Sequence, residues 1–149
     1  MTAVHDVAFD IEQWRDATIQ QVLDGAVEGD EEWARIGMAL QDVRVRDVIA
    51  WHAVNGYAAE MYRISMTAAS ILPERQRASA LCIGSICSAV LGNEQLAVAC
   101  ANFAAIADPD YNLARLLLIS RMAPGSSIME EVSGTFRGLT LDQCRHGMK

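Results

Sequence analysis

The chain has 149 residues, 52% of them hydrophobic, and a formal net charge of −7. This length suits one domain around one core, and the composition excludes an intrinsically disordered chain. Nine acidic residues and one base, Arg15, fall within residues 1–32, whereas the rest of the chain is close to neutral. Because contacts with phosphate groups need Lys and Arg, we expect neither nucleic acid nor membrane among the partners.

Segments that would direct the chain to or through a membrane are not visible in the sequence. The longest nearly apolar stretch, Leu96–Ala107, is shorter than the about 20 residues that a membrane helix needs. The N-terminus shows no basic segment that leads into an apolar run, so we expect no secretion signal. The four cysteines, Cys82, Cys87, Cys100 and Cys144, lack the spacing of metal sites and redox motifs. We therefore expect a cytoplasmic protein with free thiols, three of them packed as small hydrophobic residues, and no bound metal.

The first third of the chain predicts two helices. Apolar residues recur at helical spacing from Ile11 to about Val27, which predicts the first helix. Asp30 is a good helix-capping residue, and we expect it to begin a second, shorter helix. Trp33 and Leu40 should face the interior from that helix.

Turn residues divide the next segment into three helices. We expect the third helix over Val43–Ala53, ended by Asn55-Gly56, because these residues adopt the left-handed conformation readily. The fourth runs from Tyr57 to Leu72 and stops at Pro73, which should open the fifth helix, running to about Leu91.

The sixth helix lies between two turns, at Gly92-Asn93 and at Asp108-Pro109. From Leu96 to Ala107 its only polar residue is Asn102, so no face is suited to water. We therefore expect this helix to lie at the centre of the domain.

The C-terminal part predicts one or two further helices. Asp108 should cap the seventh helix, which ends at Pro124-Gly125. Ser127 and Glu130 form a capping-box pattern that opens an eighth helix through about Phe136. We expect residues 1–9 and 139–149 to be flexible or peripheral. The predicted fold is all-α, a single domain over residues 1–149 made of seven to eight helices with short connections.

One pair of these helices has features of a tetratricopeptide hairpin, near residues 78–107. Gly92, Ala97, Ala104 and Pro109 have the spacing of the turn, the small residues and the closing proline of that repeat. The remaining signature positions do not match, and the chain holds one copy only. We therefore predict a repeat-like hairpin inside a globular domain.

The most distinctive stretches are EWARIGMALQDVRVRDVIAW from Glu32 to Trp51, with the pair Arg46-Asp47, and ADPDYNLA from Ala107 to Ala114. In these stretches the chain resembles the actinobacterial domain of unknown function 4192, over roughly Trp14 to Pro124. The resemblance implies the C-terminal helical part of that family, whose members usually have an additional N-terminal region that this chain lacks. It implies no activity and no cofactor.

Arg46 and Asp47 form the polar pair that is best suited to a binding or structural role. An arginine can bind a carboxylate through two hydrogen bonds and so fix helices relative to each other. The structural role is the favoured interpretation. An Arg46 buried without a carboxylate partner would instead favour ligand binding.

The other chemistry-bearing residues do not combine into a known site. Asp108, Asp110 and Asn112 resemble the start of a calcium loop, but Leu113 stands where the loop needs glycine. Cys144 and His146, alone or with His5 or His52, lack the spacing of a zinc site or of a nucleophile and its base. We therefore predict no catalytic residues, no cofactor site and no metal site.

An aromatic and methionine set in the N-terminal half is the remaining candidate surface. Most of this set should belong to the core, but if two or more of its members stay exposed together, they would form the aromatic anchor that is typical of protein interfaces. The candidate interaction surface consists of Trp14, Trp33, Trp51, Tyr57, Met61 and Tyr62.

Three functional hypotheses follow. The first is a protein-interaction module that binds another protein, or itself, through a hydrophobic groove between helix hairpins. The second is a small-ligand-binding protein or enzyme with a pocket near Arg46, Asp47 and His52. The third is an acidic mimic of nucleic acid that blocks a basic protein, which requires the carboxylates to lie along one face.

Overall fold

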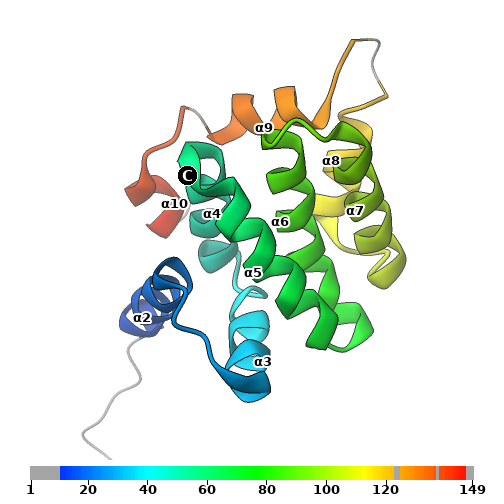
Figure 1. Cartoon of the computed structure of the whole chain (residues 1–149). Helices are drawn as coiled ribbons and strands as arrows, with labels where there is room; N and C mark the ends of the chain where they lie inside the picture. The colour runs from blue at the N-terminus through cyan, green and yellow to red at the C-terminus, as the bar shows by residue number, and fades with distance from the viewer. Residues whose placement is uncertain (1–10, 123–124, 137, 147–149) are drawn as a thin grey trace, which may run out of the picture.

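The computed structural model describes residues 11–122, 125–136 and 138–146, and these residues form helices and no strand (Figure 1). The all-α fold class is therefore confirmed. The longer helices are α2 (Ile11–Asp24), α3 (Gly29–Ala39), α4 (Val43–His52), α5 (Ala58–Ile71), α6 (Arg77–Val90), α7 (Glu94–Ala107), α8 (Asn112–Ile119), α9 (Ile128–Phe136) and α10 (Leu141–His146). Two single helical turns, η1 (Ala53–Tyr57) and η2 (Glu74–Gln76), lie before α5 and α6. Residues 1–9, expected to be flexible or peripheral, lie outside the described residues.

Several predicted turns are confirmed by the backbone. Gly56 has φ +115° within η1, which separates α4 from α5. Gly92 has φ +87° and turns the chain from α6 into α7. Asn93 caps α7 by accepting a hydrogen bond from the Leu96 amide at 3.0 Å. Ser127 likewise caps α9 by accepting a bond from the Glu130 amide at 3.1 Å.

Two predicted caps are wrong. Helix α3 begins at Gly29, where φ is +78°, and Asp30 lies inside its first turn. Asp108 ends α7, and its carboxylate accepts a bond from the Asp110 amide at 3.1 Å. That local turn occupies the side chain, so α8 begins later, after Tyr111. Pro73 likewise precedes η2, so α6 begins later than predicted, at Arg77.

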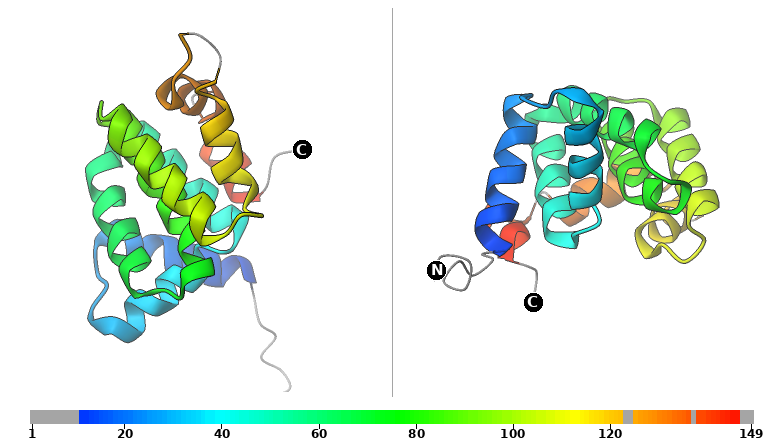
Figure 2. Two further views of the ribbon diagram at one scale, coloured as in Figure 1. Left: turned by 90° about the vertical axis from the view of Figure 1, so that its right-hand side faces the viewer. Right: turned by 90° about the horizontal axis from the view of Figure 1, so that it is seen from below.

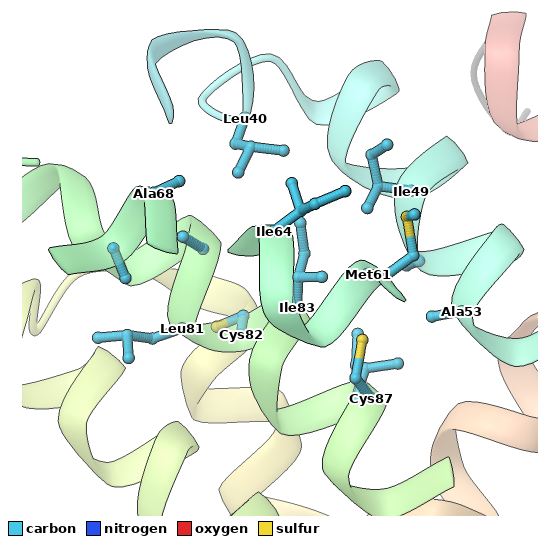
Figure 3. Close-up of a cluster of buried hydrophobic side chains, with 14 of the residues drawn as sticks. Leu40, Ile49, Ala53, Met61, Ile64, Ala68, Leu81, Cys82, Ile83 and Cys87 are labelled. Carbon is cyan, nitrogen blue, oxygen red and sulfur yellow. The ribbon is translucent and has the colours of Figure 1, made fainter. Parts of the chain in front are cut away.

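The central helix is α6, which lies between α5 and α7 (Figure 1). Every residue from Ala78 to Ala89 is buried. Isoleucine and cysteine side chains of α6 pack against Met61 and Ile64 of α5 and against Ile49 of α4 (Figure 3). The core therefore surrounds α6.

Three serines lie within the buried part of α6 and bond to backbone carbonyls. Ser79 donates to the carbonyl of Leu40, and Ser85 donates across the hairpin to the carbonyl of Ala97 at 2.6 Å. Ser88 donates to the carbonyl of Gly84 in its own helix at 2.7 Å. Because their hydroxyl groups are paired, these serines are buried without leaving a donor unsatisfied.

The prediction that Leu96–Ala107 lies at the centre is wrong. Helix α7 buries only one side, through Ala97, Cys100, Ala101 and Ala104. Its opposite side leaves Phe103 61% exposed and Ile106 67% exposed. Small residues let α7 approach α6 closely, but no described element covers its outer side. The helix hairpin of α6 and α7 exists, whereas its likeness to a tetratricopeptide repeat stays a prediction.

The first and last helices of the described residues, α2 and α10, both pack against α4. Helix α10, for which the sequence predicted no helix, packs against α4 and buries Cys144. The indole Nε1 of Trp51 donates to the carbonyl of Leu139 at 2.9 Å. Helix α2 is held to α4 by Arg15, whose Nε lies 2.7 Å from the Asp42 carboxylate. As a result α2 and α10 lie at one end of the molecule and α7 at the other (Figures 1 and 2).

Candidate functional site

The aromatic set in the N-terminal half lies mostly within or against the core. Met61 lies in the core, and Trp14, Trp33, Trp51 and Tyr62 are partly buried and packed against it. Only Tyr57 is substantially exposed, at 51%. The four partly buried side chains come from α2, α3, α4 and α5 and pack against the core between them.

A different apolar surface is exposed at the opposite end of the molecule. Phe103 and Ile106 lie one helical turn apart on the outer side of α7. They border a groove of about 310 Å³ that runs between α5, α6 and α7. The groove is lined by Met66, Ala69, Ser70, Glu74, Arg77, Leu81, Phe103, Ile106 and Ala107. We call Phe103, Ile106 and this groove the α7 face.

The α7 face carries one charge of each sign. Glu74 and Arg77 both line the groove and both are exposed. The Nε of Arg77 donates to the carbonyl of Leu72 at 2.7 Å, which fixes this side chain beside the groove. An apolar strip with both charges at its edge has the composition of a protein-binding surface.

The predicted polar pair is present and largely buried. Arg46 donates through Nε and Nη2 to the Oδ1 of Asp47, at 3.1 and 3.0 Å. Its Nη1 donates to the Tyr111 hydroxyl at 3.0 Å, which links α4 to the turn before α8. The two charged side chains are 15% and 13% exposed. Burial alone would lower the pKa of Arg46, but Tyr111 and Asp47 outweigh it and the net shift is upward. Arg46 therefore stays charged and has a carboxylate partner.

A second cavity opens beside this pair, between α4, α6, α8 and α9. Its volume is about 200 Å³. The walls are mostly apolar, and the polar groups are Arg46, Asp47, Glu131 and Thr135. The apolar lining consists of Ile86, Leu113, Leu116, Leu117, Val132 and Phe136. The contribution of α9 to this cavity is a feature that sequence reasoning missed, because no local pattern connects α9 to α4.

His52 lies elsewhere and does not line this cavity. Its ring makes edge contacts with Trp51 and Tyr57, at centroid distances of 5.1 and 5.9 Å. Its Nδ1 is buried without a hydrogen-bond partner. Burial, and secondarily the charge of Arg145, lower the pKa of His52. This histidine is therefore a neutral packing residue near neutral pH.

The cysteines are all buried free thiols. Burial raises the pKa of Cys82 and Cys87 to about 12. It also raises the pKa of Cys144 to about 11, with a smaller contribution from Asp47. Such thiols are poor nucleophiles and poor metal ligands at neutral pH. No cluster of three or more potential metal ligands occurs among the described residues, which leave out the side chain of His146.

The helix-turn residues serve to connect elements. Gly92 forms the turn between α6 and α7, and Pro109 lies in the turn between α7 and α8. Asp108 pairs with the Nε of Arg75 at 3.2 Å, and Asp110 pairs with Nη2 of the same side chain at 2.9 Å. These contacts tie η2 to the end of α7, beside the α7 face.

Comparison with known proteins supplies a family. The model of a domain of unknown function (DUF4192) matches residues 3–121 of the chain. The chain belongs to this family. The match includes the Arg46-Asp47 pair and the ADPDYNLA stretch, which confirms the resemblance at the family level and extends it nearer to the N-terminus. Helices α9 and α10 of this DUF4192 protein lie beyond the matched segment.

The comparisons with curated proteins and with solved structures found no similar protein. Within the described parts of the chain, no helix is both long enough and apolar enough to cross a membrane.

Proposed function

We propose that the protein is an interaction module that binds a second copy of itself through the α7 face. The observation that carries this proposal is the joint exposure of Phe103 and Ile106 beside an apolar groove. Adjacent exposed side chains of this size, bordered by polar groups, mark interaction sites. Leu96, Ala99 and Ala107 extend the apolar strip of α7 at helical spacing, and the exposed polar residues Gln95 and Asn102 lie along one edge of it.

The two charges at the groove favour a copy of the same chain as the partner. In a two-fold symmetric dimer every contact occurs twice, so Glu74 of one copy can meet Arg77 of the other. A partner with charges of one sign would leave Glu74 or Arg77 facing a like charge. The α7 face is therefore complementary to itself.

The distribution of charge across the molecule supports the same arrangement. Most of the net charge of −7 comes from the acidic residues at positions 1–32. Helix α2, which carries several of them, lies at the end of the molecule opposite α7 (Figure 2). Two copies that meet through α7 keep these acidic ends apart, so repulsion between them is screened by salt.

The expected dimer is weak. Full burial of a Phe or Ile side chain contributes about 1.5–3 kcal/mol, and a symmetric interface buries four of them. Association costs about 4–15 kcal/mol in lost translational and rotational freedom. Only the favourable end of these two ranges leaves a net gain, at most about 8 kcal/mol, so we expect a dissociation constant no tighter than about micromolar. We also propose that the protein acts in the cytoplasm, where its free thiols would stay reduced.

Sedimentation equilibrium tests the proposal. Over about 10 µM to 1 mM we expect the mass of the wild type to rise toward twice the 16.2 kDa of one chain. The double variant Phe103→Ser and Ile106→Ser should stay monomeric with an unchanged helical circular dichroism spectrum. Val43→Ser is the matched control, because Val43 is also an exposed aliphatic residue but lies on α4. This control should dimerise like the wild type.

A wild-type mass that stays at one chain over the whole concentration range would overturn self-association. A dimer that survives the double variant would overturn the α7 face as the interface. Loss of the dimer in Val43→Ser would show that the effect is not confined to this face.

A further inference from the structure

The cavity beside Arg46 and Asp47 has the composition of a small ligand site. Its volume of about 200 Å³ is below the about 300–1,000 Å³ that is typical of sites for drug-sized ligands. Leucine side chains of α8 and Phe136 of α9 line most of it. A ligand that fits here is therefore small and mainly apolar.

The charges at the cavity decide which polar group that ligand carries. Arg46 is neutralised by Asp47, to which it donates two hydrogen bonds, and its third bond goes to Tyr111. Glu131 lines the cavity at its exposed edge, and it forms no ion pair within the described part of the chain. The lining therefore holds one unmatched negative charge.

An anionic ligand is disfavoured at this place. It would have to compete with Asp47 for Arg46, and it would lie near the carboxylate of Glu131, which is exposed at the edge of the cavity. A cationic group would instead be attracted by Glu131, which has no ion-pair partner among the described residues. The net charge of −7 also attracts cations toward the molecule.

We propose that this cavity binds a small organic amine, with the ammonium group at Glu131 and the apolar part among Leu113, Leu116 and Phe136. The ammonium group donates hydrogen bonds to the Glu131 carboxylate. The apolar chain fills the space between α8 and α9. The Arg46-Asp47 pair holds α4 and the start of α8 in place, and so shapes the cavity wall. This site is separate from the α7 face, so either proposal can fail without the other.

Titration of the isotopically labelled protein with three probes of one chain length tests the site by nuclear magnetic resonance. Hexylamine, hexanol and hexanoate share the apolar part and differ only in the polar group. We expect hexylamine to shift the signals of α8 and α9 and to bind up to about fivefold more tightly than hexanol, because it gains an ion pair with an exposed carboxylate. Hexanoate should bind most weakly.

A pair of neighbouring variants separates ligand binding from helix stabilisation. Glu130 and Glu131 both lie in the first turn of α9, where a negative charge stabilises the helix, but only Glu131 lines the cavity. Glu131→Gln should reduce the affinity for hexylamine by up to about fivefold and leave that for hexanol unchanged. Glu130→Gln should lower the melting temperature to a similar degree and leave both affinities unchanged.

Three results would overturn the proposal. Hexanoate binding as tightly as hexylamine would show that Arg46, and not Glu131, selects the ligand. Equal effects of the two variants on hexylamine would show that Glu131 only stabilises α9. The absence of shifts around this cavity with millimolar hexylamine would show that it binds no amine.

Discussion

Two glycines inside helices differ in what an added methyl group would meet. A Cβ at Gly37 would lie 2.7 Å from three atoms of the Leu72 side chain, which is fully buried between α3 and η2. A Cβ at Gly84 would lie 2.7 Å from the Sδ of Met66, a flexible side chain at the edge of the groove. The buried Leu72 side chain has no free space to move into, whereas the Met66 side chain can move into the groove.

Alanine at these positions should therefore have opposite effects on stability. Gly37→Ala gains about 1 kcal/mol of helix propensity but costs about 1–3 kcal/mol through overpacking, so we expect it to lower the free energy of unfolding. Gly84→Ala should leave that free energy unchanged or raise it by up to about 1 kcal/mol. Urea denaturation of both variants measures the difference. A Gly37→Ala variant more stable than Gly84→Ala would contradict the packing of α3 on Leu72.

His52 makes stability depend on pH. Its pKa in the folded state is below the ordinary value of about 6.5, because the ring is buried and lies near Arg145. The unfolded chain therefore binds a proton more readily than the folded chain as the pH drops below that value. The stability present above about pH 6.5 is lost as the pH falls through the folded pKa.

Replacing the imidazole removes this loss. We expect the urea midpoint of the wild type to fall more between about pH 7.5 and pH 5.5 than that of His52→Gln. An equal fall in both proteins would show that other groups cause the pH dependence.

At the scale of helices, Asp42 joins two elements by one side chain. Its Oδ1 accepts a bond from the Arg44 amide at 2.9 Å and caps α4, and its Oδ2 lies 2.7 Å from Nε of Arg15 on α2. Both carboxylate oxygens are therefore in use. Sequence patterns did not single out Asp42, because its partner Arg15 lies 27 positions away.

Two substitutions separate the cap from the ion pair. Asp42→Asn keeps a good capping residue and loses the charge, and we expect it to lower the free energy of unfolding by about 1 kcal/mol or less. Asp42→Ala loses both interactions and should cost about 1–3 kcal/mol. Thermal denaturation ranks the two variants. Equal losses would mean that the cap contributes nothing, and no loss in Asp42→Asn would mean that the charge of the ion pair contributes nothing.

The sequence predicted where helices begin and end better than it predicted which helix is central. Asn55-Gly56, Pro73 and Gly92-Asn93 mark chain reversals through local conformational preferences, so their positions could be read directly. The identity of the central helix depends on long-range packing. Helix α6 contains Ser79, Ser85 and Ser88, and its buried part includes them because backbone carbonyls accept hydrogen bonds from their hydroxyl groups.

Long-range packing also limited what the sequence predicted about the candidate sites. The sequence predicted the pairing of adjacent Arg46 and Asp47, but it gave no sign that Tyr111 and Glu131 lie near them. It also assigned the apolar residues of α7 to the interior, because composition alone does not tell whether an apolar side faces a core or a partner. Most of the large aromatic residues of the N-terminal half were expected in the core, and they lie partly buried against it.

At the scale of the whole molecule, polarity is distributed unevenly. The acidic residues gather toward the N-terminal end, α6 is surrounded by other helices, and α7 exposes an apolar side at the far end (Figures 1 and 2). This uneven distribution is the feature on which the proposed self-association through the α7 face depends.

Hydrogen–deuterium exchange measured at two protein concentrations tests this arrangement most directly. On raising the concentration from about 5 µM to about 500 µM, we expect slower exchange in residues 74–77 and 99–107. Residues 78–89 of α6 should be the most protected at both concentrations, and residues 11–24 of α2 should not change. Exchange in α7 that is independent of concentration, or α6 amides that exchange as fast as those of α7, would contradict the account.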